Sequence, residues 1–406
     1  HAADKGYLAI SWTNTAGGNY SEGGNWQGGV PPGPSDGALF TNTATHTVTV
    51  DASVTNGASV FTASSGETTV SIPGAVQWVH TNNFFVGSSN QSKASVVLTG
   101  GGTLVAKWAK ISGATNSAAS LTLETGTYIF TNSANTGVDV GCANNNGNSS
   151  GTLVLADSGV LLMVTNGTGI ALGGNGDSGT YSNNYGKMIM RGGTIRTTGL
   201  RLPFGNTSSA DILIETGTIF NAGNTAVTIG QGGGPGTGTV VLASSGASLI
   251  STGSSASVSM VVGDKKFTVG TILASNGVVQ SKDMIIGNLG TGWVSVENDA
   301  NLMVLSNFQI GSVTGGLGTL NGVGRMTMSD SATMIVSNNM QIPWNGTAHG
   351  LGTGVLVMAS QNALLTVSNT LTVGANFTNL GSGTMIISNG TVRPRVLSVG
   401  QFSDGL

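Results

Sequence analysis

Charge is scarce in this sequence. Its 406 residues include 14 Lys and Arg and 17 Asp and Glu, 8% of the chain, against about 25% in an ordinary soluble domain. The net charge of −3 is thinly spread and forms no basic stripe that would neutralise phosphates, which argues against nucleic acid as a partner. Gly, Asn, Ser and Thr occupy most positions outside the apolar ones, so we expect exposed faces of hydroxyl and amide groups. This composition favours a polymer or a rigid extracellular protein.

Cysteine and long apolar runs are also nearly absent. The single cysteine, Cys142, excludes an internal disulfide framework, and we expect it to be a small buried residue. The longest apolar runs, such as 160–164, are far shorter than the ~20 residues of a membrane-spanning helix, so we expect no membrane span. The chain begins His1-Ala2-Ala3 with no charged-then-apolar segment after it, which predicts a mature N-terminus left after removal of a secretory signal. We therefore expect a secreted protein, extracellular or at the cell surface.

A repeated phrase dominates what is present. It consists of a short alternating strand, a polar turn with Gly or Asn, a second apolar strand and often a Val-Gly or Ile-Gly close, and its copies at 151–164 and 354–367 are plainly related. Such recurrence indicates a solenoid. Units are expected to begin near thirteen positions, 22 to 35 residues apart: Val48, Val70, Val96, Leu121, Leu153, Met188, Ile212, Val240, Ile272, Val294, Met326, Leu356 and Met385.

The local period selects the type of solenoid. Segments such as 121–124, 212–215 and 294–297 alternate apolar with polar residues, which is typical of half-buried strands, and no stretch shows an apolar stripe at helical spacing. A unit with two or three short strands makes one turn of a parallel β-helix. The prediction is an all-β fold, a right-handed parallel β-helix (β-solenoid) of about 12 to 13 turns over residues 46–406, after a short irregular N-terminal segment, 1–45. The twelve methionines are expected to fill gaps in its core.

Turn residues and inserts recur at fixed places in the unit. Gly or Asn is expected at the corner between the first two strands for structural reasons, as in 158–159, 245–246, 276–277, 362–363 and 389–390. Longer Gly- and Asn-rich inserts follow the last strand of several units, at 173–186, 230–238, 311–318 and 345–352. We expect these inserts to share one edge of the solenoid.

The first 45 residues do not follow the repeat, and their Trp and Pro residues leave little room for regular strand pairing. The run 23–36, Gly-Gly-Asn-Trp-Gln-Gly-Gly-Val-Pro-Pro-Gly-Pro-Ser-Asp, followed by the apolar strand 38–40, resembles the opening of large secreted bacterial surface proteins. Those proteins continue into Gly-rich repeats of the autotransporter-associated β-strand type. The resemblance implies surface or extracellular placement and a β-helical fold.

Catalytic and metal sites are poorly supported. Parallel β-helices include polysaccharide lyases and hydrolases, but glycoside hydrolysis needs two carboxylates about 5 to 10 Å apart, and no Asp-Asp or Asp-x-Asp occurs here. Single acidic residues instead recur at the corner after the first strand, which indicates a turn role. Because no carboxylate pair is present, we expect no enzyme activity. The spacing of the histidines is not that of metal ligands, so we also expect no metal and no cofactor. The acidic corner residues are Glu124, Asp157, Glu215 and Glu297, and the histidines are His1, His46, His80 and His349.

The C-terminal end is the feature from which we predict a function. The segments 385–392 and 396–400 form a full repeat unit with no polar cap after it, so its last strands are expected to be exposed. The N-terminal segment of a second copy is expected to cover them, which joins copies head to tail into an extracellular filament or sheath. Arginines at this end are expected to meet Asp4, Glu22 or Asp36 of the next copy. The predicted assembly interface comprises Trp12, Trp26, Pro31, Pro32, Pro34, Arg393, Arg395, Val396, Val399 and Phe402.

Two alternatives remain open. The first is a monomeric adhesin or matrix protein that binds surface glycans through its loop edge, which predicts aromatic residues in or beside the inserts, such as Tyr181, Tyr185, Trp344 and Phe377. The second, less favoured, is a β-helical polysaccharide lyase or hydrolase.

Overall fold

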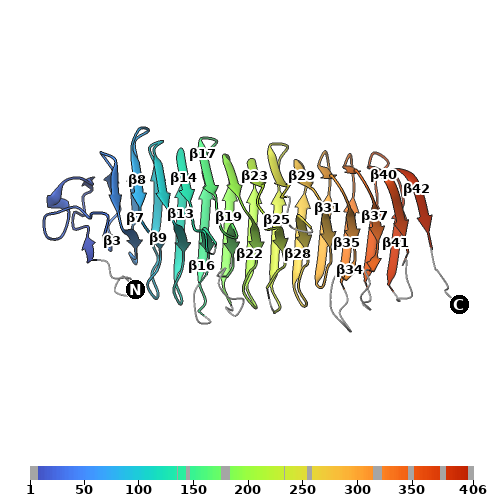
Figure 1. Ribbon diagram of the computed structural model, residues 1–406, viewed down its shortest axis with the longest axis horizontal. Coiled ribbons are helices and arrows are strands. Elements are labelled where there is room, and N and C mark those ends of the chain that lie inside the picture. Colours follow the sequence, from blue (N-terminus) through green and yellow to red (C-terminus); the bar gives the residue numbers. More distant parts are fainter. Residues whose placement is uncertain are drawn as a thin grey trace. The chain divides into compact units, whose positions relative to one another are not determined.

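The computed structural model describes residues 8–134, 136–142, 147–174, 183–232, 234–253, 258–313, 322–345, 352–374 and 381–400. The chain divides into two compact units, unit 1 (1–198 with 208–210) and unit 2 (199–207 with 211–406), and each is a stack of parallel strands (Figure 1). The only helix in the described segments is one 3-10 turn, η2 (Gly23–Asn25). The chain is an all-β parallel β-solenoid of about 13 turns, as the repeat predicts.

Each full turn contains three strands. The first strand belongs to one parallel sheet, and the second and third strands belong to another. First strands of unit 1 are β2 (Gly18–Asn19), β4 (His46–Thr49), β7 (Glu67–Ser71), β10 (Ser95–Thr99), β13 (Ala118–Leu123), β16 (Ser150–Leu155) and β19 (Tyr185–Met190). First strands of unit 2 are β25 (Thr237–Leu242), β28 (Val269–Ala274), β31 (Thr291–Val296), β35 (Val323–Met328), β39 (Thr353–Met358) and β41 (Ser382–Ile387), while β22 (Ser209–Ile214) contains the boundary between the units.

The second and third strands form two columns of the other sheet. In unit 1 the second strands are β5 (Val54–Asn56), β8 (Gln77–His80), β11 (Thr103–Ala106), β14 (Gly126–Phe130), β17 (Val160–Val164) and β20 (Thr194–Thr197). Its third strands are β1 (Leu8–Ser11), β3 (Asp36–Phe40), β6 (Ala58–Phe61), β9 (Asn83–Val86), β12 (Trp108–Ile111), β15 (Val138–Val140) and β18 (Ile170–Leu172).

Unit 2 follows the same plan. Its second strands are β23 (Gly217–Asn221), β26 (Ala247–Ser251), β29 (Val278–Ser281), β32 (Asn301–Val304) and β36 (Thr333–Val336). Its third strands are β21 (Leu200–Leu202), β24 (Val227–Ile229), β27 (Met260–Val262), β30 (Met284–Ile286), β33 (Phe308–Ile310) and β37 (Met340–Ile342). The strands β40 (Leu364–Val373) and β42 (Thr391–Val399) each run through both columns, and β34 (Ser312–Val313) pairs with β38 (Trp344–Asn345) in a small separate sheet.

The register follows the predicted unit starts closely. Val294, Met326, Leu356 and Met385 are direct partners in successive first strands, as are Leu121 and Leu153. The spacing is wrong at one step, because Val70 pairs with Leu98, two residues beyond the predicted Val96. A two-residue slip keeps the same face inward, so the alternation alone could not reveal it.

Two columns of glycine let consecutive turns approach closely. A glycine follows most strands of the third column and has a positive φ there, from 62° to 110°, which favours glycine, whereas Ser112, Pro203 and Pro343 follow β12, β21 and β37. The second residue of most first strands is also glycine, and a Cβ there would lie within 3 Å of backbone atoms of the preceding closing corner. The closing glycines are Gly87, Gly141, Gly173, Gly230, Gly263, Gly287, Gly311, Gly374 and Gly400. The strand glycines are Gly151, Gly186, Gly238, Gly270, Gly292, Gly324, Gly354 and Gly383.

Aliphatic ladders fill the interior of both units. Nine of the twelve methionines are buried, as predicted, and Met326, Met328 and Met358 occupy the inward columns of unit 2 with no exposed surface. Cys142 is buried, as expected. The corner glycines and asparagines also lie where predicted, between first and second strands, and Gly277 and Gly390 have positive φ there. The predicted inserts follow third strands, although 233, 175–182, 314–321 and 346–351 lie outside the described residues.

The N-terminal segment is more regular than the sequence indicates. β1 pairs with β3, β3 with β6, and β2 with β4, all in parallel, so residues before 45 already belong to both sheets. The longest part without a strand is 20–35, which contains the 3-10 turn η2 and an isolated antiparallel bridge from Trp26 to Trp12. Its aromatic rings enter the core, which we describe with the candidate site below.

A polar cluster lies inside unit 1 near this end. The Nε2 atom of His80 lies 2.8 Å from Ser59 Oγ, and Trp78 Nε1 donates to Asn56 Oδ1 at 2.9 Å. The His80 ring is 3% exposed and packs on Trp78 and Phe84. Burial lowers the pKa of His80 to about 3 from its usual 6.5, because the charged ring would lose its hydration.

We expect His80 to make stability depend on pH. The unfolded chain takes up a proton below about pH 6.5 and the folded chain only near pH 3, so stability present at neutral pH is lost as pH falls through that window. At pH 4.5 the loss is about 2.5 kcal/mol. Urea unfolding of wild-type and His80→Gln protein at pH 7 and pH 4.5 measures it. Equal losses in both proteins would contradict the assignment.

The glycine columns make a second prediction. A Cβ at Gly292 would meet the Val262 carbonyl and the Gly287 amide, so Gly292→Ala is expected to lower the free energy of unfolding by about 3 kcal/mol. The control is Gly246→Ala, where the nearest atom to an added Cβ is Thr216 Cβ at 3.6 Å and the expected change is within about 0.5 kcal/mol. Denaturant unfolding of both variants measures the two changes in the free energy of unfolding. Similar losses of stability in both variants would refute the argument that Gly292 has no space for a side chain.

Candidate functional site: the C-terminal turn

The last described turn consists of β41 and β42. The Asn389-Gly390 corner joins them, and the φ of 114° at Gly390 explains the glycine. β41 pairs with β39 and β42 with β40, and no described strand pairs with their other edges. Both strands therefore present unpaired backbone N–H and C=O groups, the usual template for adding another strand.

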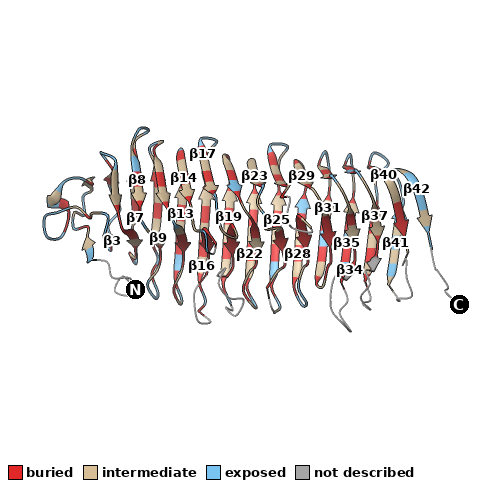
Figure 2. Ribbon diagram, in the orientation of Figure 1, coloured by how far each residue is buried: buried red, intermediate tan, exposed pale blue. Residues whose placement is uncertain are grey.

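The core columns are uncovered at this turn. Leu371 is fully buried, but its register partner Leu397 is 58% exposed. Likewise Val373 is 9% exposed and its partner Val399 69%. Figure 2 shows β42 in tan and pale blue only, whereas the interior strands alternate red with tan. Ile387 is 48% exposed, although its register partner Met358 is fully buried, so positions that are core elsewhere in unit 2 form an apolar surface here. Val396 is 49% exposed beside them, but its partner Thr370 is not a core residue.

Two arginines give this turn a positive charge. Arg393 and Arg395 are both exposed on β42. They are the only formally charged side chains among the described residues of 331–400, because the last acidic residue before them is Asp330. Phe402, the remaining predicted residue of this end, lies outside the described residues.

An asparagine ladder leads to Arg395. Asn338 donates its Nδ2 to Asn307 Oδ1 at 3.0 Å, and Asn369 donates to Asn338 Oδ1 at 3.3 Å. The register of β40 and β42 shifts between Val367 and Thr370, so the single residue Arg395 lies opposite the pair Ser368 and Asn369. The sequence analysis did not predict this ladder. A Ser-Asn pair recurs in three consecutive repeat units, at 306–307, 337–338 and 368–369, and this recurrence could have indicated it.

The predicted N-terminal interface residues lie in unit 1. Trp12 and Trp26 are 1% and 3% exposed, and their rings meet edge to face at 5.0 Å and both contact Phe40. Trp26 Nε1 donates to the Tyr20 carbonyl at 2.7 Å. The two indoles therefore cap the unit's own core rather than form its surface, and any contact with a second copy must use their exposed neighbours.

The outer surface at this end is built from other residues. Pro32 is buried, Pro31 is half-buried and Pro34 is exposed, with the Pro34 carbonyl accepting a hydrogen bond from Thr81 Oγ1 at 3.1 Å. Leu8 on β1 and Val30 are 68% and 63% exposed. Glu22, which the sequence analysis paired with the arginines, is exposed and accepts a hydrogen bond from Asn19 at 3.0 Å.

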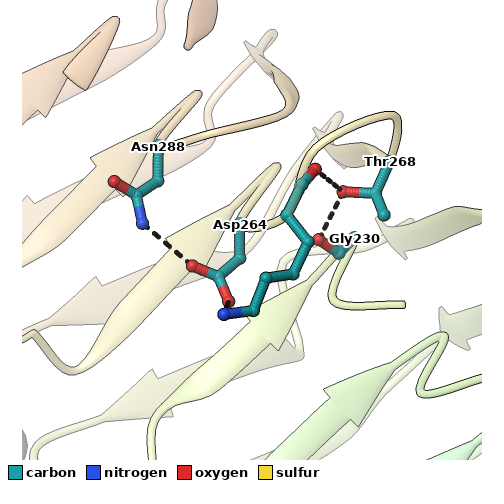
Figure 3. Close-up of polar contacts among 5 residues, drawn as sticks. Gly230, Asp264, Thr268 and Asn288 are labelled. Carbon is teal, nitrogen blue, oxygen red and sulfur yellow. Dashed lines mark hydrogen bonds and ion pairs between the residues drawn. The ribbon is translucent and has the colours of Figure 1, made fainter. Parts of the chain in front are cut away.

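The loop edge of unit 2 carries an exposed aromatic. The loop 263–268 joins β27 to β28. Asp264 Oδ1 accepts a hydrogen bond from Asn288 Nδ2 of the next turn at 2.9 Å (Figure 3), and Asp264 Oδ2 lies 3.9 Å from Lys265 Nζ. Thr268 Oγ1 lies 2.7 Å from the carbonyl of Gly230 in the turn before. Phe267, at φ 68° and 66% exposed, lies under the Lys266 ammonium at 4.7 Å.

The other loop aromatics give less information. Tyr185 begins β19 and is half-buried, whereas Tyr181, Phe377 and the side chain of Trp344 lie outside the described residues. Phe267 was not among the residues predicted for this edge.

The acidic corner residue Asp157 has a structural role. Its Oδ1 accepts the Gly159 N–H at 2.8 Å, and its Oδ2 accepts from Thr125 Oγ1 of the preceding turn at 2.9 Å. Glu297 accepts from Ser295 Oγ at 2.6 Å. His46 and His80 are buried, while His1 and His349 lie outside the described segments.

Neither a metal centre nor a spanning helix emerges from the described part of the chain. Across those residues, no three His, Cys, Asp or Glu side chains gather closely enough to hold a metal ion. None of the helices described has the length and apolar character that crossing a bilayer requires. Comparison with known proteins found no matching family model, no similar curated protein and no similar solved structure.

The exposure of core positions at the C-terminal turn can be tested by comparing two leucines of the same column, one buried and one exposed. Leu371→Ala is expected to lower the free energy of unfolding by about 3 kcal/mol, because it leaves a cavity in a filled column. Leu397→Ala, one turn later in the same column, is expected to lower it by less than about 1 kcal/mol. Urea unfolding in dilute solution distinguishes the two. Equal losses would mean that Leu397 is covered in solution.

Proposed function

We propose that this chain is a structural subunit of an extracellular filament or sheath, whose copies join head to tail through the ends of the solenoid. The observation that carries the proposal is the C-terminal turn, where core positions such as Leu397 and Val399 are exposed beside open strand edges. Burying such a surface against another turn is favourable at about 25 cal/mol per Å² of apolar area.

The other end of the chain offers a matching edge. β1 lies in the third-strand column of unit 1, and among the described residues only β3 pairs with it. Its four residues, with Leu8 exposed, equal in number the segment Val396–Val399 in the third-strand column of unit 2. A parallel pairing of these two edges would continue the solenoid from one copy to the next.

Charge favours this pairing over one between like ends. Residues 8–50 contain Glu22 and Asp36 and no Lys or Arg, whereas the C-terminal turn contains Arg393 and Arg395 and no acidic residue. Opposite ends therefore attract and like ends repel. The contact joins two different surfaces, so it propagates into a filament unless it closes into a ring.

The low charge and the hydroxyl-rich surface are consistent with an extracellular structural role, because a stack of weakly charged copies has little self-repulsion. A monomeric adhesin that binds glycans through its loop edge is the second candidate. The exposed Phe267 is the observation that favours it.

The assembly prediction is tested with two variants of the C-terminal turn. Arg393→Glu with Arg395→Glu, and separately Leu397→Asp, are expected to abolish filaments, because one reverses the charge of the C-terminal turn and the other buries a carboxylate in the contact. Lys265→Glu with Lys266→Glu is the matched control, with the same change in net charge on an exposed loop. Negative-stain microscopy and sedimentation velocity at rising protein concentration provide the readout.

Filaments from the wild-type chain and the control, but not from the two end variants, would support the proposal. Single particles from the wild-type chain at every concentration would refute it. Loss of filaments in the loop control to the same extent would also refute contact through the ends.

A further inference from the structure

The outer face of the first-strand sheet in unit 2 carries one exposed tryptophan. Trp293 lies at the centre of β31 and is 52% exposed, whereas Trp12, Trp26 and Trp78 are buried. Its register partners on the neighbouring strands are Thr271 of β28 and Arg325 of β35. The ring therefore lies on a flat sheet face, away from the end turns and on a strand instead of a loop.

The other exposed or half-buried tryptophan and several accessible phenylalanines have partners within the described residues, and Trp293 has none there. Phe204 lies under Arg201 at 5.0 Å and Phe267 under Lys266 at 4.7 Å. The Trp108 ring meets Phe85 edge to face at 5.7 Å and lies under Lys110 at 4.9 Å, and its Nε1 donates to Asp139 Oδ2 at 2.9 Å. Among the described residues, Trp293 has no ring or cation partner, and its indole N–H donates to no protein group.

The surface around the ring has a defined chemistry. The outward positions of β25, β28, β31, β35, β39 and β41 are mainly Thr, Ser and Val, and Arg325 is the only charged residue among them. Arg325 is exposed and forms no ion pair with the described residues. Leu273 and Val323, 39% and 36% exposed, extend the apolar surface beside the ring. An open aromatic face thus adjoins a free guanidinium and hydroxyl groups.

We propose that Trp293 and Arg325 form a binding site for an acidic polysaccharide. A pyranose ring has an apolar face that can pack on an indole. Tryptophan and arginine are also enriched among the residues that contribute most binding energy once a partner covers them. The guanidinium matches a carboxylate or sulfate in a paired geometry. Strands lie about 4.8 Å apart, close to the length of one sugar, so neighbouring strands meet neighbouring residues of one chain.

The surrounding charges agree with an anionic ligand. Lys265 and Lys266 lie in the loop that enters β28, and their side chains are exposed. The carboxylates nearest along the chain are Glu297, Asp299 and Asp330, all at the corners that follow β31 and β35. Glu297 accepts a hydrogen bond from Ser295 Oγ, and Asp330 accepts from the Asn298 N–H and from Ser329 Oγ. A protein partner would need a larger apolar patch than three side chains supply, so the glycan is the favoured occupant.

Affinity electrophoresis of the full chain tests the site. Native gels containing polygalacturonate, alginate or dextran sulfate are compared with gels containing neutral dextran, at low and high salt. We expect retardation by at least one acidic polymer and none by dextran. Trp293→Ala is expected to weaken binding roughly tenfold or more, and Arg325→Gln to weaken it several-fold with loss of most of the salt dependence.

Phe267→Ala is the control, because it removes the exposed aromatic of the loop edge and leaves the sheet face intact. Unchanged binding by Phe267→Ala together with loss in Trp293→Ala supports the site. Wild-type binding by Trp293→Ala, equal retention by dextran, or no retention by any acidic polymer would overturn it. None of these substitutions lies in the end turns, so the result is independent of filament formation.

Discussion

The close approach of glycine to glycine at the closing corner of most turns is the constraint on which the rest of this structure depends. The chain leaves a third strand through a closing glycine such as Gly287, and the next first strand passes so near that Gly292 has no space for a side chain. This contact places first strands against the end of the preceding turn. Consecutive strands can then pair in parallel through both sheets, and the aliphatic columns line up one above another.

In such a fold, unpaired strand edges and uncovered core residues remain only at the ends of the stack. Every interior turn is covered by its two neighbours, but a terminal turn has one neighbour and one open side. At the N-terminal end of unit 1 the rings of Trp12, Trp26 and Tyr20 close the core. At the C-terminal turn of unit 2 the same columns remain open, with arginines instead of rings beside them. This difference between a closed acidic end and an open basic end is the physical basis of the proposed assembly.

The repeat and its period could be predicted from sequence because each turn uses the same alternation and the same corner residues. The starts at Val294, Met326, Leu356 and Met385 fall in register for that reason. The step from Val70 could not be placed, since a slip of two residues leaves the inward face unchanged. The tryptophans of the N-terminal segment were ambiguous as well, because a large ring suits a core and an interface equally. The exposure of Trp293 could not be predicted, because it depends on which face of the strand is outward and on what covers that face. The sequence of a single repeat unit determines neither.

Hydrogen exchange as a function of protein concentration tests the central claim most directly. If copies join end to end, the amides of 391–399 and of 8–11 gain protection together as concentration rises, while those of interior strands such as β31 stay unchanged. The same gain is then absent in the protein with Arg393→Glu and Arg395→Glu. Exchange in 391–399 that does not change with concentration, or protection gained by interior strands instead, would contradict the account.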